Sequence, residues 1–479
     1  MQAVGFPKEL QNEIDVSLPA FISSTTVKVA PSNTSVVGPA TVVIPGASST
    51  VLPWNGLSQN VLFDLPAGNK TQFVDPRFTT LSFRVRYQIS TAIVGAATAS
   101  AYLRSSASSF WDRAYIQSQD GTILEDINMY GLVADTLLQL ETDIAQRDAV
   151  AMMYGLLHEA TGVASQNNCQ GHQIPLFTGA PAAVGSEYRS YCVPLISGLI
   201  GKGASKMFQI GATSRLQLIM QSSALEPITI ILPSASAGAV SITIDNIALN
   251  LQYIDIGTEG LRMLNKTGPQ YYSGLTYRVS SATLSAGAAN QVQILTGTRG
   301  SSVRNIITRI TENAATTAVA NCVNGFYDSK LPVATTCAYQ INGLQIPSNP
   351  VDLVHNPATA FAFLQECNGA FDNYQMKSSI TPDRYCNYIV GPTLPSDVDY
   401  NINSSTSSSV SQSSFMFGYN LEKVSKFGIL DGMNCNSGQT YLMLSLVGGS
   451  TNALTFYFVS KLDCIWILDT ATGSVSVRL

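Results

Sequence analysis

The chain has 479 residues, of which 12% are charged and 45% are hydrophobic, and its mean hydropathy is +0.16. Charged residues usually make up about 25% of a globular protein, so this sequence predicts a surface that is polar but nearly uncharged. Such a surface favours a protein that covers itself with partner subunits, because interface cores are depleted in charge. The net charge of −5 and the absence of any Lys/Arg run in the sequence argue against specific nucleic-acid binding.

Targeting and cysteine signals in the sequence are weak. Met1 to Lys8 lacks the basic and apolar regions of a signal peptide, and no window has the roughly 18 apolar residues of a membrane span. The eight cysteines form no CxxC pair, which argues against a zinc ribbon and favours free thiols. They are Cys169, Cys192, Cys322, Cys337, Cys367, Cys386, Cys435 and Cys464.

The first 50 residues are predicted to be an extended arm, and strands are predicted from about residue 60. Phe78–Ile89 alternates in polarity, which indicates a strand with one face on a core. Its apolar face consists of Leu81, Phe83, Val85 and Tyr87. Phe110–Asp126 is predicted to form a β-hairpin around Asp120-Gly121. Further strands are expected at Val61–Leu65, Tyr191–Ile196, Arg215–Met220, Ile228–Leu232 and Val240–Ile256.

Three segments have helical character. Asn128–His158 shows helical spacing of apolar residues and predicts one or two helices inside a long connection. Thr258–Asn265 is predicted as a short helix with Thr258 as its N-cap. Asn356–Asn368 is predicted as a helix that Asn356-Pro357 opens.

A second run of strands begins near Gln270. Its predicted strands are Tyr271–Val279, Gln291–Leu295, Val303–Thr311, Ala338–Ile346, Asn387–Val390, Ser414–Tyr419, Thr440–Val447 and a closing pair, Ala453–Val459 and Cys464–Leu468. The Ser-rich stretch 401–414 is predicted to be an exposed loop. Short strands separated by turn-rich loops, with a break near 257–270, indicate two β-sandwiches or barrels and not an alternating α/β fold.

Candidate catalytic residues are few. The three histidines, His158, His172 and His355, have no catalytic context, and the sequence has no G-x-S-x-G elbow. Gly198–Lys206 looks superficially like a phosphate loop, but Gly203 follows Gly201-Lys202 where Ser or Thr is required. We therefore expect a glycine turn between strands.

Acidic motifs are equally unspecific. Asp397, Asp399 and Asn401 match the opening of an EF-hand loop, but Ile402 and Ser408 stand where Gly and Glu are required. Of the available carboxylate pairs, Asp245 and Asp255 lie at opposite ends of one strand, too far apart for glycoside hydrolysis. The other pair is Glu125 with Asp126, for which solvated side chains are expected. We nominate no catalytic, cofactor-binding or metal-binding residue and expect no enzyme activity.

One segment resembles a known family. Tyr191–Met220 is similar to the first jelly roll of double jelly-roll major capsid proteins, as found in Polinton-like viruses, adintoviruses, virophages and the adenovirus-hexon lineage. Phe110–Ile116 and Gly121–Glu125 resemble that family's hairpin, which a helix follows. Ile242–Ile256 with its short helix resembles the passage between the two jelly rolls. By motif, the resemblance covers about residues 60–265.

The resemblance implies an all-β fold of two tandem jelly-roll β-sandwiches with short helices in the connections. On this basis we expect an N-terminal arm over 1–55, a first jelly roll over 56–257, a linker with a helix over 258–270 and a second jelly roll over 271–479.

The resemblance also implies a function. It predicts a major capsid protein whose homotrimers form pseudo-hexagonal capsomers and tile the icosahedral shell of a double-stranded DNA virus. The partners would be neighbouring capsomers, penton and minor capsid proteins and, through the arm, an internal membrane. The protein would assemble inside the host cell and reside in the virion. The alternatives are a minor capsid, penton or spike protein, and a lectin-like carbohydrate-binding sandwich, which predicts a site lined with Trp. The tryptophans are Trp54, Trp111 and Trp466.

Overall fold

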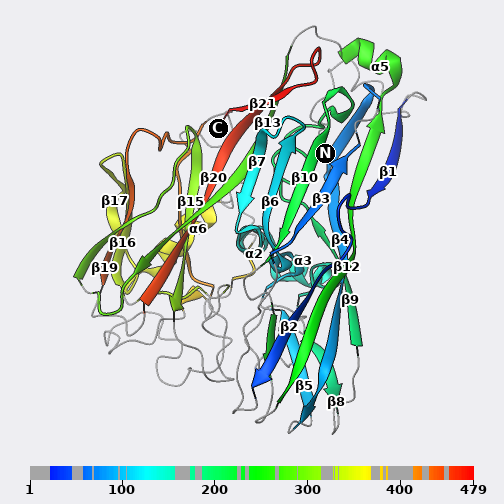
Figure 1. The fold of residues 1–479 in the computed structure, drawn as a ribbon. Coiled ribbons are helices and arrows are strands. Elements are labelled where there is room, and N and C mark those ends of the chain that lie inside the picture. Colours follow the sequence, from blue (N-terminus) through cyan, green and yellow to red (C-terminus); the bar gives the residue numbers. More distant parts are fainter. Residues whose placement is uncertain are drawn as a thin grey trace.

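A computed structural model of the chain shows two β-sandwiches side by side (Figure 1). The residues that it describes are 22–45, 58–66, 69–94, 98–103, 105–156, 173–178, 186–223, 228–231, 237–264, 269–288, 290–313, 327, 329–332, 334–367, 378–380, 385–386, 414–422, 431–446 and 453–478. Within this part of the chain, no helix is long and apolar enough to cross a membrane.

The first sandwich consists of two antiparallel sheets. One has the order β1-β12-β4-β9, with β2 also paired to β12. Its strands are β1 (Ser23–Val29), β2 (Val37–Pro45), β4 (Gln72–Val94), β9 (Ser186–Pro194) and β12 (Ala237–Asp255). The other has the order β3-β10-β6-β7. Its strands are β3 (Asn60–Leu65), β6 (Trp111–Ser118), β7 (Ile123–Asn128) and β10 (Leu216–Ser222). A small side sheet contains β5 (Thr98–Leu103), β8 (Gln173–Thr178) and β11 (Ile228–Ile231).

The second sandwich repeats this arrangement. One sheet has the order β13-β20-β15-β18, and β21 also pairs with β20. Its strands are β13 (Gln270–Leu284), β15 (Val303–Asn313), β18 (Met416–Asn420), β20 (Ala453–Leu468) and β21 (Val475–Arg478). The other sheet has the order β14-β19-β16-β17. Its strands are β14 (Asn290–Leu295), β16 (Ala334–Ile341), β17 (Leu344–Asp352) and β19 (Thr440–Leu446).

Both sandwiches are jelly rolls. When the main strands of each sandwich are counted along the chain, with β1 and β2 taken together as the first, both show the orders 1-8-3-6 and 2-7-4-5. This is the strand order of a jelly roll made of two Greek keys. The expected all-β fold of two tandem jelly rolls is confirmed, and we call the two units the first roll and the second roll.

Alternating side chains build the core of the first roll. As predicted, Leu81, Phe83, Val85 and Tyr87 of β4 are buried. The ring of Phe83 meets that of Trp111, on the opposite sheet, edge to face at 5.5 Å, which is a favourable aromatic geometry. The predicted hairpin is also confirmed, because Gly121 turns between β6 and β7 with a φ of 83°.

Five α-helices lie in the described connections. They are α2 (Tyr130–Glu141), α3 (Ile144–Ala149), α4 (Ala151–Tyr154), α5 (Gly257–Leu264) and α6 (Pro357–Glu366), with 3₁₀ turns at η1 (Ala107–Phe110) and η4 (Ile210–Ala212). The first three replace the one or two helices predicted over 128–158, because Thr142 is extended and Asp143 starts a new helix by accepting from the N–H of Gln146. The predicted start of α6 is confirmed, since Asn356 accepts from the N–H of Thr359.

The predicted N-cap of α5 is wrong. Thr258 lies inside the helix, which begins at Gly257 with a φ of 66°. The side chain of Asp255 caps this end instead, by accepting from the N–H of Gly257 at 2.9 Å.

Two predicted strands of the second roll also need correction. Ala338–Ile346 is a hairpin and not one strand, because Asn342 and Gly343 take φ values of 52° and 84° and reverse the chain between β16 and β17. The closing pair Ala453–Val459 and Cys464–Leu468 is a single strand, β20. It continues through polar residues because Asp463 accepts from Ser302 at 2.6 Å and from Arg304 at 2.6 Å.

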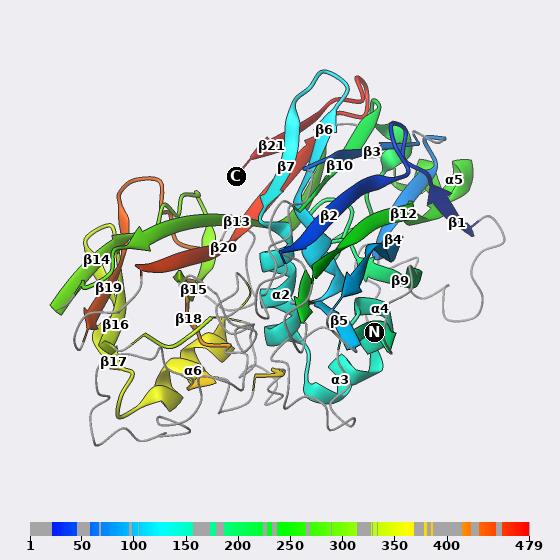
Figure 2. The ribbon, with the colours of Figure 1, turned by 60° about the horizontal axis from the view of Figure 1, so that its bottom comes forward.

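Part of the expected N-terminal arm belongs to the first roll. Residues 23–45 contain β1 and β2, both hydrogen-bonded to β12. The predicted strand Asn387–Val390 lies outside the described residues, and so does nearly all of the Ser-rich stretch 401–414. Figure 2 shows β13 and β20 running from the second roll towards the first, where β13 lies beside β7.

Candidate functional site: the junction between the two jelly rolls

Backbone hydrogen bonds join the two rolls directly. The loop after β9 lies against β13, where the N–H of Leu275 donates to the carbonyl of Gly203 at 2.9 Å and that of Ser205 donates to the carbonyl of Ser273 at 3.2 Å. Further along, the N–H of Ser214 donates to the carbonyl of Gly473 at 2.7 Å. The first roll therefore extends the edge of the second by short pieces of β-ladder.

Glycines make this close approach possible. A Cβ atom added to Gly198 would lie 2.5 Å from Cη2 of Trp466, and one added to Gly274 would overlap the carbonyl oxygen of Gly198. The stretch Gly198–Lys206 is thus a set of turns, as expected, and its glycines allow close packing of the backbone. Lys202 forms an ion pair with Glu141 at 2.5 Å.

A buried carboxyl group holds the same loop. Glu125 of β7 accepts from the hydroxyl of Ser197 at 2.5 Å and from the N–H of Gly198 at 2.7 Å. Burial raises its pKa, and hydrogen bonds, including one from Thr276 of the second roll, oppose this rise. Beside it, the indole N–H of Trp466 donates to the carbonyl of Leu124 at 3.0 Å. The buried polar groups of Glu125, Ser197 and Trp466 therefore all have hydrogen-bond partners, as such groups require.

At the end of β7, the side chain of Asn128 makes the hydrogen bonds to β13 that a neighbouring strand would make. The amide of Asn128 donates to the carbonyl of Val279 at 2.8 Å and accepts from its N–H at 3.1 Å. This pair imitates the exchange of hydrogen bonds between two strands, so the edge of β13 is satisfied by a residue of the other roll.

A fully buried ion pair connects α2 to the second roll. Arg309 of β15 and Asp135 of α2 lie 2.5 Å apart, and both side chains are 0% exposed. Asp135 also accepts from Ser105 and from Gln139, and Arg309 donates to the carbonyl of Tyr327 at 2.5 Å. Because a buried charge is costly without its partner, this pair fixes the position of α2 against the second roll.

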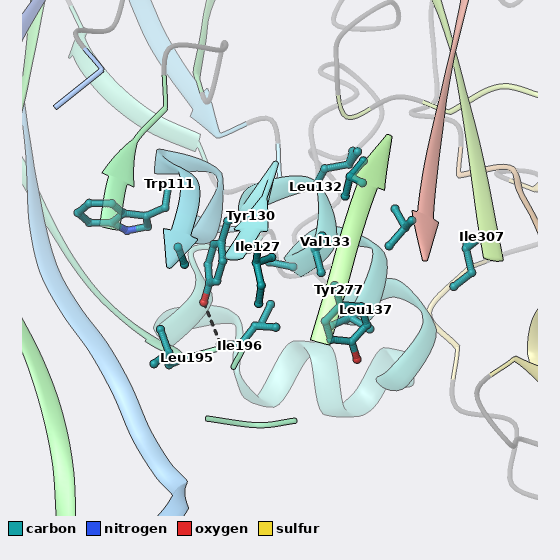
Figure 3. Close-up of a cluster of buried hydrophobic side chains, with 14 of the residues drawn as sticks. Trp111, Ile127, Tyr130, Leu132, Val133, Leu137, Leu195, Ile196, Tyr277 and Ile307 are labelled. Carbon is teal, nitrogen blue, oxygen red and sulfur yellow. Dashed lines mark hydrogen bonds between the residues drawn. The ribbon is translucent and has the colours of Figure 1, made fainter. Parts of the chain in front are cut away.

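Apolar side chains fill the space between these polar contacts. Figure 3 shows Leu137 of α2 beside Tyr277 of the second roll; Leu132, Val133 and Ile307 belong to the same cluster of buried side chains. The hydroxyl of Tyr130 accepts from the N–H of Ile196 at 2.9 Å. The buried side chains of both rolls form one continuous hydrophobic cluster, so the two sandwiches share a core.

Residues that the sequence singled out for chemistry are not brought together in the described structure. His355 lies at the end of β17, where its Nδ1 atom is 3.0 Å from Asp352. Asp126 pairs with Arg113 on the surface, whereas its neighbour Glu125 is buried. Asp245 pairs with Arg84, far along β12 from Asp255. The remaining candidates lie outside the described residues; they are His158, His172, Asp397, Asp399, Asn401 and Trp54.

Metal-binding and aromatic sites are also absent from the described part of the chain. Among these residues, no group of three His, Cys, Asp or Glu side chains could hold a metal ion. Trp111 and Trp466 are both fully buried, so neither forms a surface platform for sugars. Six cysteines are free thiols, namely Cys192, Cys337, Cys367, Cys386, Cys435 and Cys464; Cys169 and Cys322 lie outside the described range.

Sequence reasoning missed the residues that form the junction. Asp135 carried a signal, because it is the only charged residue of α2 before Glu141 at the end of the helix. The roles of Asn128, Arg309 and Trp466 carried none, since their partners lie more than 150 residues away in the sequence.

Comparisons with known proteins give matches at the level of structure. No protein-family model matches the chain, and no curated protein matches its sequence. It is similar to the capsid of PBCV-1 virus (TM-score 0.54, 12% identity, 96% of this chain and 97% of the other). It is also similar to the mavirus major capsid protein (TM-score 0.55, 8% identity, 100% and 96%) and to a chain of the Sputnik virophage (TM-score 0.51, 12% identity, 92% and 89%). The neighbours are double jelly-roll major capsid proteins, and at such identities the likeness defines the fold of this chain as theirs.

Proposed function

We propose that this chain is the major capsid protein of a tailless icosahedral virus with double-stranded DNA. Three copies would form a capsomer in which six jelly rolls make a pseudo-hexagon, and capsomers would tile the shell of the virion. The observation that carries the proposal is the junction, which fuses two rolls of the same strand order into one body with a shared core. The whole-length likeness to capsid proteins of viruses and virophages supports it.

The chemistry of the described residues fits a protein that acts by assembly and not by catalysis. Buried polar groups at the junction are used for packing, and the low charge fraction of 12% suits broad contacts between subunits. The further partners that we propose are neighbouring capsomers, penton and minor capsid proteins and an internal membrane, without specific binding of nucleic acid.

We also propose domain limits that follow the strands. The first roll would start at β1 and end with β12, α5 would link the rolls, and the second roll would start at β13. The segment before β1 would remain as an arm for contacts between capsomers.

Electron microscopy of the recombinant protein tests the proposed function. We expect particles with hexagonal outlines and, by light scattering, a mass of three copies of the 51.1 kDa chain. A purely monomeric protein at micromolar concentration would contradict the proposal. Within virions, a copy number confined to the vertices would favour the alternative of a penton or minor capsid protein, and binding to a glycan array would favour the lectin-like alternative.

A further inference from the structure

Each roll has a corner at which its first and last strands pair in the same register. In the first roll, the first residue of the opening strand pairs with the last residue of the closing strand, Ser23 with Asp255. In the second roll, Gln270 pairs with Leu468 in the same way. Thr25 and Tyr253 of the first roll are therefore the positional counterparts of Tyr272 and Trp466 of the second, and they form the corresponding cross-strand pair.

In the second roll, the first roll covers this corner. Trp466 is fully buried and donates to Leu124. The ring of Tyr272 packs against Phe208 with the ring centroids 4.9 Å apart. The corner of the second roll thus forms a socket, and the elements that occupy it are β7, the loop after β9 and Phe208.

In the first roll, no described element of the chain covers the same corner. A cleft of about 230 Å³ lies there, and we call it the first-roll cleft. It is lined by Ser23, Thr25, Val27, Pro66, Gln72, Tyr253 and Asp255. Ser23 and Thr25 are exposed. The volume is below the roughly 300–1,000 Å³ of small-molecule pockets, and it suits side chains of another protein surface.

We propose that the first-roll cleft is the docking site for the second roll of another copy of this chain. The incoming elements are the counterparts of those that fill the socket, namely β17 in place of β7 and residues 431–439 in place of the loop after β9. This inference rests on the proposed assembly into capsomers and assigns the contact to residues.

Three observations favour a second copy as the occupant. The chain already makes this roll-to-roll contact once internally, so it carries both halves of a head-to-tail interface, and a repeated contact of this kind closes into a ring when the rotation allows. Strand β17 is partly exposed, with Leu344 65% accessible. Its only charged residue is Asp352, and charge depletion is typical of interface cores.

Arginine substitutions on each side of the contact test the inference. Thr25→Arg places a long cation in the cleft, and Thr26→Arg on the opposite face of the same strand is the matched control. Ser348→Arg alters β17, and Thr283→Arg on an exposed site of β13 is its control. By native mass spectrometry we expect the trimer fraction of Thr25→Arg and of Ser348→Arg to fall at least tenfold, while far-UV circular dichroism shows that both variants remain folded. Both controls should assemble like the wild type.

A mixture of the two disrupted variants identifies the mode of contact. Thr25→Arg retains an intact β17 and Ser348→Arg retains an intact cleft, so a head-to-tail contact predicts a one-to-one heterodimer and no ring. Trimers from Thr25→Arg alone, or a mixture that stays monomeric, would overturn the docking inference while leaving the capsomer proposal in place. A wild-type protein that never trimerises would overturn both.

Discussion

The ion pair between Asp135 and Arg309 gives the sharpest prediction for stability. Asp135→Ala leaves the guanidinium of Arg309, at 0% exposure, without its counter-ion. Removing one partner of such a pair costs about 3–5 kcal/mol. Because the urea m-value grows with the surface exposed on unfolding, the unfolding midpoint should fall by this loss divided by the m-value measured for the wild-type chain. The comparison must be made at fixed protein concentration, because assembly itself stabilises the folded chain.

A surface pair provides the matched control. Arg113 and Asp126 lie 2.7 Å apart with side chains 37% and 38% exposed, so Asp126→Ala should cost less than about 1 kcal/mol. A double-mutant cycle with Arg309→Met isolates the coupling of the buried pair. A loss for Asp135→Ala no larger than that for Asp126→Ala would refute the reasoning that the pair fixes α2 against the second roll.

Three further predictions concern the junction and the helices. Gly198→Ala forces a methyl group against Trp466 and should cost about 1–3 kcal/mol; a urea midpoint equal to that of the wild type would contradict this. Asn356→Ala removes the cap of α6 and should cost about 1 kcal/mol, which thermal unfolding followed by circular dichroism can measure. Burial raises the pKa of Glu125 above the usual 4.5. The contribution of the protonated Glu125 carboxyl to the free energy of unfolding is therefore fully present below about pH 4.5 and is lost as pH rises through the folded-state pKa. Stability relative to Glu125→Gln should therefore decline with rising pH, and a difference that stays flat from pH 4 to 8 would exclude this titration.

Local patterns in the sequence identified most of the elements. The alternation in β4, the Asp120-Gly121 turn and the Asn356 cap depend on residues close together in the chain, so they could be predicted. Errors arose where local signals were ambiguous. The prediction of one strand over Ala338–Ile346 does not account for the Asn342-Gly343 turn. The polar residues within β20 favour an interruption in the sequence, because the buried partners of Asp463, Ser302 and Arg304, lie in another part of the chain.

Patterns along the chain are enough to predict the all-β class, the division into two units and, through Tyr191–Met220, the resemblance to capsid proteins. How the two units combine can be seen only in the folded chain. The reason is physical: the junction depends on contacts such as Asn128 with Val279 and Asp135 with Arg309, which join residues 151 and 174 positions apart. The first-roll cleft is likewise visible only when the two rolls are compared in space, because the described residues cover one of two equivalent corners and leave the other uncovered.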